Sequence, residues 1–213
     1  MTLPANLGDR EVQKFEENSD GEVAIRITPQ KVDRLTGSII TIDYAHHEVH
    51  GGSSFASDVV DTTLANAETI CLAFKTAAGT KRIHLIEKWI VLVSGYIDLI
   101  EGPTWTNQTG TKVPIYNRKR ETTMKSSVLL EDQAQLGFVA SNNVIGNVTG
   151  LSGGTTISTE YAFGTRRSPA SRARGTNEWI LKPDTQYCIR LTSTANSNAA
   201  QIILDWYEHT DTV

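Results

Sequence analysis

Hydrophobic side chains alternate with polar or small ones through much of this 213-residue chain, and that alternation restricts its fold more than any other feature. In GEVAIRITP, Val23, Ile25 and Ile27 occupy every second position, and two segments near the C-terminal end repeat the pattern. A period of two places successive side chains on opposite faces of a strand, as in a sheet with one buried face. Turn-forming residues separate these segments about every ten residues, which is typical of sandwiches and barrels. The chain is therefore predicted to be all-β, a jelly-roll-like antiparallel β-sandwich.

Individual strands are predicted wherever apolar, alternating segments lie between turn residues. They are expected at 21–29, 37–50, 69–76, 82–102, 112–120, 126–133, 185–194 and 199–209. The short polar sequence ANSN (195–198) predicts that the last two strands form an antiparallel hairpin. Helical patterns are weak, although 58–69 and 131–140 could each hold a turn or two. The segment 141–159, rich in Gly, Ser, Thr and Asn, is expected to be a long loop or a set of weak strands on the rim.

Residues 1–35 are predicted to be an extended N-terminal arm, and residues 36–213 the β-sandwich domain. The arm holds one good strand between charged flanks, which is too little apolar material to bury a core alone. A single strand leaves a row of unpaired backbone N–H and C=O groups, so its natural partner is an exposed sheet edge on another chain. Val23, Ile25 and Ile27 are therefore candidate interface residues.

Composition argues against several classes of function. The formal net charge is −4, which disfavours a nucleic-acid binder that relies on overall positive charge. No apolar run approaches the roughly 20 residues of a membrane-spanning helix, and the polar, acidic start has no signal-peptide core. The protein is therefore expected to fold in a cytoplasm, with neither membrane nor nucleic acid as partner. Cys71 and Cys188 lie in apolar, strand-like segments and are expected to be reduced, buried thiols.

Three of the five histidines, His46, His47 and His50, lie close together in HHEVHGGSSF, which raises the question of a metal site. The zinc-protease motif needs two histidines four apart on a helix, whereas His47 and His50 are three apart in a predicted strand. On a strand, His46 and His50 share a face but lie roughly 13 Å apart, too far to share an ion. We therefore expect no metal site, and expect hydrogen bonds to loop backbone where the strand turns into the glycines. A site completed by His84 or His209 is the alternative.

Two other groups of residues are candidates for binding. The sequence RRSPASRARG holds four arginines: Arg166, Arg167, Arg172 and Arg174. Guanidinium groups make forked contacts with carboxylates and phosphates. This segment is therefore a solvated loop, an interface with an acidic protein surface, or a site for nucleic acid or an anionic sugar. Trp105 and Tyr116 are candidates for stacking on a carbohydrate, although a tryptophan at a loop tip could instead cover its own sheet.

Signatures of catalysis are missing from the sequence. The chain has no Gly-x-Ser-x-Gly nucleophile elbow, and GLSGGTT (150–156) lacks the Lys-Ser/Thr that completes a phosphate-binding loop. Acidic residues are scattered, so no pair is singled out for glycoside hydrolysis. We predict no catalytic residues and no cofactor, and we do not expect an enzyme.

Six segments are distinctive as a series. In chain order they are YAHHEVHGGSSF, LANAETICLAFKT, GTKRIHLI, IDLIEGPTWTNQTGTKVPIYNRKR, ARGTNEWILKPDTQYCIRLTS and ILDWYEHTD. As a set they resemble a group of virion structural proteins from tailed bacteriophages, over roughly residues 40–210. The opening GDREVQKFEE with VAIRITP is similar to the arm that such proteins carry. None of these segments is a catalytic signature.

The resemblance implies a small β-sandwich on the virion surface, a capsid decoration or cement protein made in the cytoplasm of the host bacterium. Its partner would be the major capsid protein, and the threefold positions that cement proteins often occupy imply a homotrimer. A head or tail fibre component, or a carbohydrate-binding adhesion module that contacts a surface glycan, is the alternative. In this interpretation HHEVHGGSSF is the corner where the last strand of the arm enters the sandwich, and its glycines allow the turn.

Overall fold

The chain separates into two units, Met1–Asp43 and Tyr44–Val213. The computed structural model describes residues 16–17, 23–24, 44–106, 109–124, 126, 144–163 and 178–210. The predicted boundary between residues 35 and 36 lies outside these ranges.

The first unit is described at one short antiparallel ladder. Strand β1 (Glu16–Glu17) pairs with β2 (Val23–Ala24). The remainder of the strand predicted over 21–29 lies outside the described residues.

The second unit is built almost entirely from strands, as predicted. It begins with the helix α1 (Tyr44–Gly51). The strands are β3 (Ser54–Leu64), β4 (Thr69–Lys75), β5 (Lys81–Val91), β6 (Gly95–Glu101), β7 (Thr111–Val113), β8 (Tyr116–Asn117), β9 (Val144–Gly146), β10 (Thr155–Ala162), β11 (Trp179–Ile180), β12 (Gln186–Ser193) and β13 (Asn198–Thr210). Among the described residues, no helix has the length and apolar character needed to cross a membrane.

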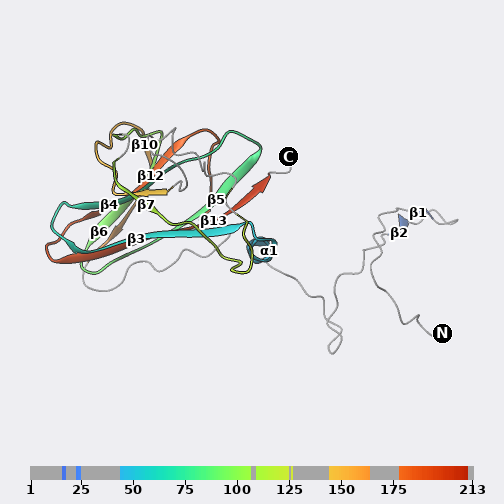
Figure 1. Ribbon diagram of the computed structural model, residues 1–213, viewed down its shortest axis with the longest axis horizontal. Helices are drawn as coiled ribbons and strands as arrows, with labels where there is room; N and C mark the ends of the chain where they lie inside the picture. Colours follow the sequence, from blue (N-terminus) through green and yellow to red (C-terminus); the bar gives the residue numbers. More distant parts are fainter. Residues whose placement is uncertain are drawn as a thin grey trace, which may run out of the picture. The chain divides into compact units, whose positions relative to one another are not determined.

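The strands of this unit form two antiparallel sheets, seen as two layers in Figure 1. The six-stranded sheet has the order β10-β6-β12-β4-β9-β7, and the five-stranded sheet has the order β11-β5-β13-β3-β8. Buried side chains from both sheets belong to one hydrophobic cluster, so the sheets pack face to face. The predicted all-β antiparallel sandwich is confirmed.

The order of strand pairing is that of a jelly roll. β3 pairs with β13, β4 with β12, β5 with β11 and β6 with β10, so the first half of the unit pairs with the second half in reverse order. Successive pairs of this long double ribbon alternate between the two sheets, as they do when such a ribbon is rolled up. The remaining strands extend the sheets, with β8 beside β3 and with β9 and β7 beyond β4.

Short turns carry the chain between the sheets after β3, after β5 and after β12. The turn after β12 lies between the other two and is hydrogen-bonded to both. On one side Ala67 N donates to Ser193 O at 2.9 Å, and on the other Thr194 N donates to Ser94 O at 3.1 Å. The three crossings are therefore held together as one layer at this end of the sandwich.

Asn198 fixes the middle crossing with its side chain, which is fully buried. Its amide Nδ2 donates to Ser94 O at 2.8 Å and to Ser193 Oγ at 2.9 Å. Its Oδ1 accepts from Val93 N at 2.9 Å and from Ala199 N at 3.0 Å. One side chain thus satisfies backbone groups of both chain segments that meet here, which is what a buried amide requires.

The hairpin predicted between 185–194 and 199–209 is wrong. β12 lies in the six-stranded sheet and β13 in the five-stranded sheet, so they pair with other strands and not with each other. A polar sequence between two alternating segments is the usual signal for a hairpin. It does not distinguish a turn within one sheet from a crossing between two, because both leave the alternation of the flanking strands intact.

The prediction of a strand over 37–50 is also wrong for residues 44–50, the described part of that range, because they belong to helix α1. The helix ends in a Schellman motif, in which Gly52 N donates to Val49 O at 3.1 Å and Ser53 N donates to Glu48 O at 3.0 Å. Gly52 has φ of 79°, the left-handed conformation that this cap needs. The two glycines of HHEVHGG are thus a helix stop, a signal that the period-two interpretation overlooked.

Other local expectations are revised as well. The segment 82–102 is two strands, β5 and β6, separated by a crossing turn. The weak helical pattern at 58–69 is wrong, because β3 runs as a strand to Leu64. The segment 141–159 does hold strands, β9 and the start of β10. The predicted strand at 126–133 is described only at its first residue, and 131–140 lies wholly outside the described residues.

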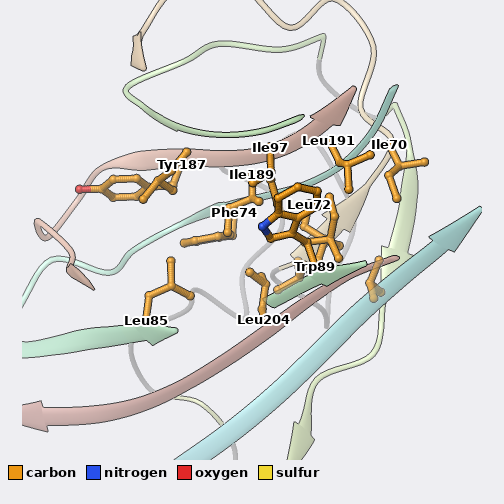
Figure 2. Close-up of a cluster of buried hydrophobic side chains, with 14 of the residues drawn as sticks. Ile70, Leu72, Phe74, Leu85, Trp89, Ile97, Tyr187, Ile189, Leu191 and Leu204 are labelled. Atoms are coloured by element: carbon orange, nitrogen blue, oxygen red, sulfur yellow. The ribbon is translucent and has the colours of Figure 1, made fainter. Parts of the chain in front are cut away.

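The core lies between the sheets. In Figure 2, side chains from the six-stranded sheet, including Leu72 and Ile189, point toward Leu85, Trp89 and Leu204 of the five-stranded sheet. These five side chains are 3% exposed or less. Because the inner faces are filled by this packing, candidate binding residues lie on the outer faces and on α1.

Candidate functional site

The outer face of the six-stranded sheet carries three neighbouring aromatic side chains at its β10 edge, which we call the aromatic row: Tyr96, Tyr161 and Phe163. Tyr161 of β10 lies directly opposite Tyr96 of β6, and their ring centroids are 5.3 Å apart. Phe163 follows two residues later on the same face, and its ring is parallel to that of Tyr161 at 5.6 Å. Tyr161 is 57% exposed and Phe163 82%. Adjacent exposed aromatic rings of this kind are typical of a binding surface.

Three polar residues on neighbouring strands lie beside the aromatic row, and we call them the polar trio: Thr159, Asp98 and Arg190. Thr159 Oγ1 donates to Asp98 Oδ1 at 2.7 Å, and Arg190 Nη2 donates to Asp98 Oδ2 at 2.8 Å. The Asp98 carboxylate is buried, whereas 34% of the Arg190 side chain is exposed. The hydrogen bond to Asp98 raises the pKa of Arg190, so the guanidinium stays charged and can donate to a ligand on this face.

Two buried thiols lie further along the same face. Cys71 of β4 and Cys188 of β12 belong to a small hydrophobic cluster under Trp105, separate from the main core. The Cys188 thiol donates a hydrogen bond to the Cys71 sulfur, which lowers the pKa of Cys71. The same hydrogen bond, together with burial, raises the pKa of Cys188 well above its ordinary value.

Trp105 does not offer a stacking surface to a sugar, which corrects its prediction as a carbohydrate candidate. Its side chain is 8% exposed and packs with Ile100 and Ile145 over the thiols. The alternative interpretation, a tryptophan that covers its own sheet, agrees with this burial. Tyr116, the other carbohydrate candidate, is 50% exposed on β8 and stays a candidate.

The outer face of the five-stranded sheet is organised by ion pairs. Asp205 is buried, and its carboxylate contacts Lys88 Nζ at 2.9 Å and Arg118 Nη1 at 2.9 Å. In the same basic stretch as Arg118, the Arg120 guanidinium lies 5.4 Å from the centre of the Tyr116 ring. Cations of this stretch thus have local structural contacts, and this lowers their value as evidence for an anionic ligand.

A histidine and a glutamate meet near the end of the five-stranded sheet. His84 Nδ1 hydrogen-bonds to Glu178 Oε1, and the Tyr207 hydroxyl donates to the same oxygen at 2.8 Å. The His84 ring stacks on Tyr207 at 4.6 Å, and the ring of His209 lies edge-on at 5.8 Å. His84 and Tyr207 are both buried, so their contacts with Glu178 help to hold this end of the sheet together.

His46, His47 and His50 lie on α1, and their side chains are exposed. Because α1 is a helix, the expected separation of roughly 13 Å between His46 and His50 is wrong. Their Nε2 atoms are 2.9 Å apart, and their ring planes are inclined at 68°. Within the described ranges, no cluster of three or more His, Cys, Asp or Glu side chains is placed to hold a metal ion.

The other predicted interface residues are not tested by the structure. The four arginines of the basic loop lie outside the described residues: Arg166, Arg167, Arg172 and Arg174. Ile25 and Ile27 also lie outside them, and Val23 belongs to the short strand β2. These residues remain predictions.

Local sequence patterns contain little sign of the aromatic row. Tyr161 and Phe163 alternate with Ala162, which is a strand signal, but they follow a Gly- and Thr-rich segment that favoured a loop. Tyr96 lies within a long apolar run, where an aromatic residue is expected to be core. The pairing of β6 with β10 brings them together, and such long-range pairing is not encoded in local periodicity.

Comparison of the chain with protein-family models, with curated proteins and with solved structures gives no match. A function must therefore be argued from the residues and the geometry described above.

Proposed function

We propose that the chain is a structural protein of a tailed-bacteriophage virion. It is a capsid decoration or cement protein that docks on the shell of the major capsid protein and stabilises it. It acts by binding and has no catalytic role. The resemblance of the six sequence segments to virion structural proteins supports this proposal, as does a jelly-roll sandwich, an architecture common in capsid domains.

One observation carries the proposal: the chain divides between Asp43 and Tyr44 into a jelly roll and a separate N-terminal unit. The described residues of the second unit form a filled core of their own. The apolar pattern of Val23, Ile25 and Ile27 in the first unit suits anchoring to a partner surface. A homotrimer matches the threefold positions of a capsid shell.

The test is binding to the shell. Purified full-length protein is mixed with empty shells of the major capsid protein from the same phage and sedimented. We expect saturable co-sedimentation, a higher melting temperature of the decorated shell, and a trimer in analytical ultracentrifugation. A strict monomer that stays in the supernatant at every protein concentration would refute the proposal.

The aromatic row favours a second candidate, a carbohydrate-binding module on a fibre or adhesive particle protein. Exposed aromatic rings stack on the apolar faces of sugar rings, and the neighbouring polar trio supplies a charged donor for sugar hydroxyls. Tyr161, Phe163 and Arg190 would contact the glycan.

A tyrosine on each sheet allows a matched test of this second candidate. Tyr161→Ala is expected to weaken binding to a host surface polysaccharide at least tenfold, which corresponds to a loss of about 1.4 kcal/mol. Tyr116→Ala is the control, because Tyr116 is similarly exposed but lies on the other sheet. Affinity is measured by isothermal titration calorimetry after a glycan array identifies the sugar. An array without signal eliminates this candidate, and a loss confined to Tyr116→Ala moves the sugar to the five-stranded sheet.

A further inference from the structure

We propose that His46 and His50 form a two-histidine site for a divalent transition-metal ion on the exposed side of α1. The two residues are four apart, so one helical turn places them on the same face. Their Nε2 atoms approach to 2.9 Å and both side chains are exposed, so an ion can reach them from solvent. This site goes beyond the proposed role in the virion and does not depend on it.

The separation of the two nitrogens matches a pair of neighbouring metal ligands. Imidazole nitrogens bind such ions at about 2.0–2.1 Å, so two of them at a right angle lie about 3.0 Å apart, and at a tetrahedral angle about 3.4 Å. The observed 2.9 Å fits adjacent positions of an octahedral or square-planar ion.

The protonation states open to His46 and His50 allow a metal ion to take the place of their hydrogen bond. At 2.9 Å one Nε2 donates a hydrogen bond and the other accepts it. A neutral imidazole can carry its proton on Nδ1 instead, which leaves the Nε2 lone pair for an ion. A metal ion then replaces the shared hydrogen bond without moving either side chain far.

The helix holds these side chains in place before any ion arrives. Glu48, on the opposite side of the helix, is buried, and α1 packs against β3 and β13. The Schellman motif at Gly52 fixes the C-terminal end of the helix. Ligands that are already positioned lose less conformational entropy on binding, which favours affinity.

The ligand set selects the class of ion. Imidazole suits Cu²⁺, Ni²⁺ and Zn²⁺, whereas Mg²⁺ and Ca²⁺ prefer oxygen ligands. The affinity of such a site for divalent ions of the first transition row peaks at Cu²⁺, so Cu²⁺ is expected to bind most tightly. Within the described part of the chain, no third His, Cys, Asp or Glu joins the pair.

The experiment titrates full-length protein without an affinity tag with CuCl₂, NiCl₂ and MgCl₂ in a weakly coordinating buffer at pH 7.5, by isothermal titration calorimetry. The variants are His46→Ala, His50→Ala and His50→Gln. The last keeps an amide that can hydrogen-bond to His46 and removes the metal ligand. His47→Ala is the matched control, because His47 lies on the same helix, is 68% exposed in its side chain and points to another side. Circular dichroism checks that each variant is folded.

We expect one Cu²⁺ or Ni²⁺ ion per chain and no Mg²⁺ binding. Each change at His46 or His50 should weaken Cu²⁺ binding at least tenfold, and the Cu²⁺ electron paramagnetic resonance spectrum should lose its splitting from two nitrogens. His47→Ala should bind as the unchanged protein does. The proposal is overturned if the variants at His46 and His50 keep the original affinity, if His47→Ala loses as much as they do, or if no ion binds at one per chain.

Discussion

Replacing Asn198 with alanine is expected to lower the free energy of unfolding by about 3 kcal/mol. The change removes four hydrogen bonds and leaves the Ser94 carbonyl and the Val93 amide without their side-chain partner. An unsatisfied buried polar group costs about 1–3 kcal/mol, and a small cavity adds to it. For a chain of this size the melting temperature should fall by about 6–12 °C.

Asn196→Ala is the matched control for this prediction. Asn196 lies in the same turn, is exposed, and accepts one hydrogen bond, from Asn66 N at 3.0 Å. Surface changes of this kind usually stay within about 0.5 kcal/mol. Urea denaturation followed by tryptophan fluorescence measures both variants. Equal destabilisation by the two changes would show that Asn198 does not fix the crossing.

Deleting residues 1–34 is expected to abolish attachment to the capsid shell, or to abolish the trimer, while the melting temperature stays nearly unchanged. The deletion removes most of the N-terminal unit, Met1–Asp43, and leaves α1 and every strand of the jelly roll. The ladder described in this unit, β1 with β2, joins two pairs of residues, which is too few to offset a backbone entropy of about 1–2 kcal/mol per residue. We therefore expect the unit to need an exposed sheet edge of another chain as its partner.

The deletion variant is compared with the full chain by differential scanning calorimetry and by co-sedimentation with shells. Two results would contradict the prediction. Unfolding of the shortened chain would make the N-terminal residues part of the sandwich core. Full occupancy of shells by the shortened chain would move the docking surface to the jelly roll, with Arg166, Arg167, Arg172 and Arg174 as the first residues to substitute.

The fold class could be predicted because a strand with one buried face must alternate, and buried and less buried residues do alternate in the first half of β13. The pairing partners of the strands could not be predicted, because the pairing of β12 with β4 and β6 depends on contacts far apart in sequence. The wrong prediction of a hairpin at ANSN (195–198) has this origin. A polar turn looks the same to local periodicity whether the next strand joins the same sheet or the opposite one.

The site was harder to predict than the fold, for two physical reasons. The segment with His46 and His50 was predicted to be a strand, which would separate the two residues by roughly 13 Å. It is a helix, in which residues four apart lie in contact. At Trp105 the residue type suggested an exposed platform, but burial depends on what lies beneath, here the cluster around Cys71. The aromatic row arises only when β6 and β10 pair, so no single stretch of sequence contains it.

The central position of β13 has a consequence for biosynthesis. β13 is the last strand of the jelly roll to be translated, yet it lies between β3 and β5, and β12 lies between β4 and β6. While the ribosome is still adding these residues, the earlier strands have no neighbour on the edges that will later receive them. The sandwich therefore closes in a late step governed by long-range contacts, which is slow compared with helix formation. Until then the nascent chain presents open strand edges, and a chaperone that shields them is expected to raise the yield of folded protein.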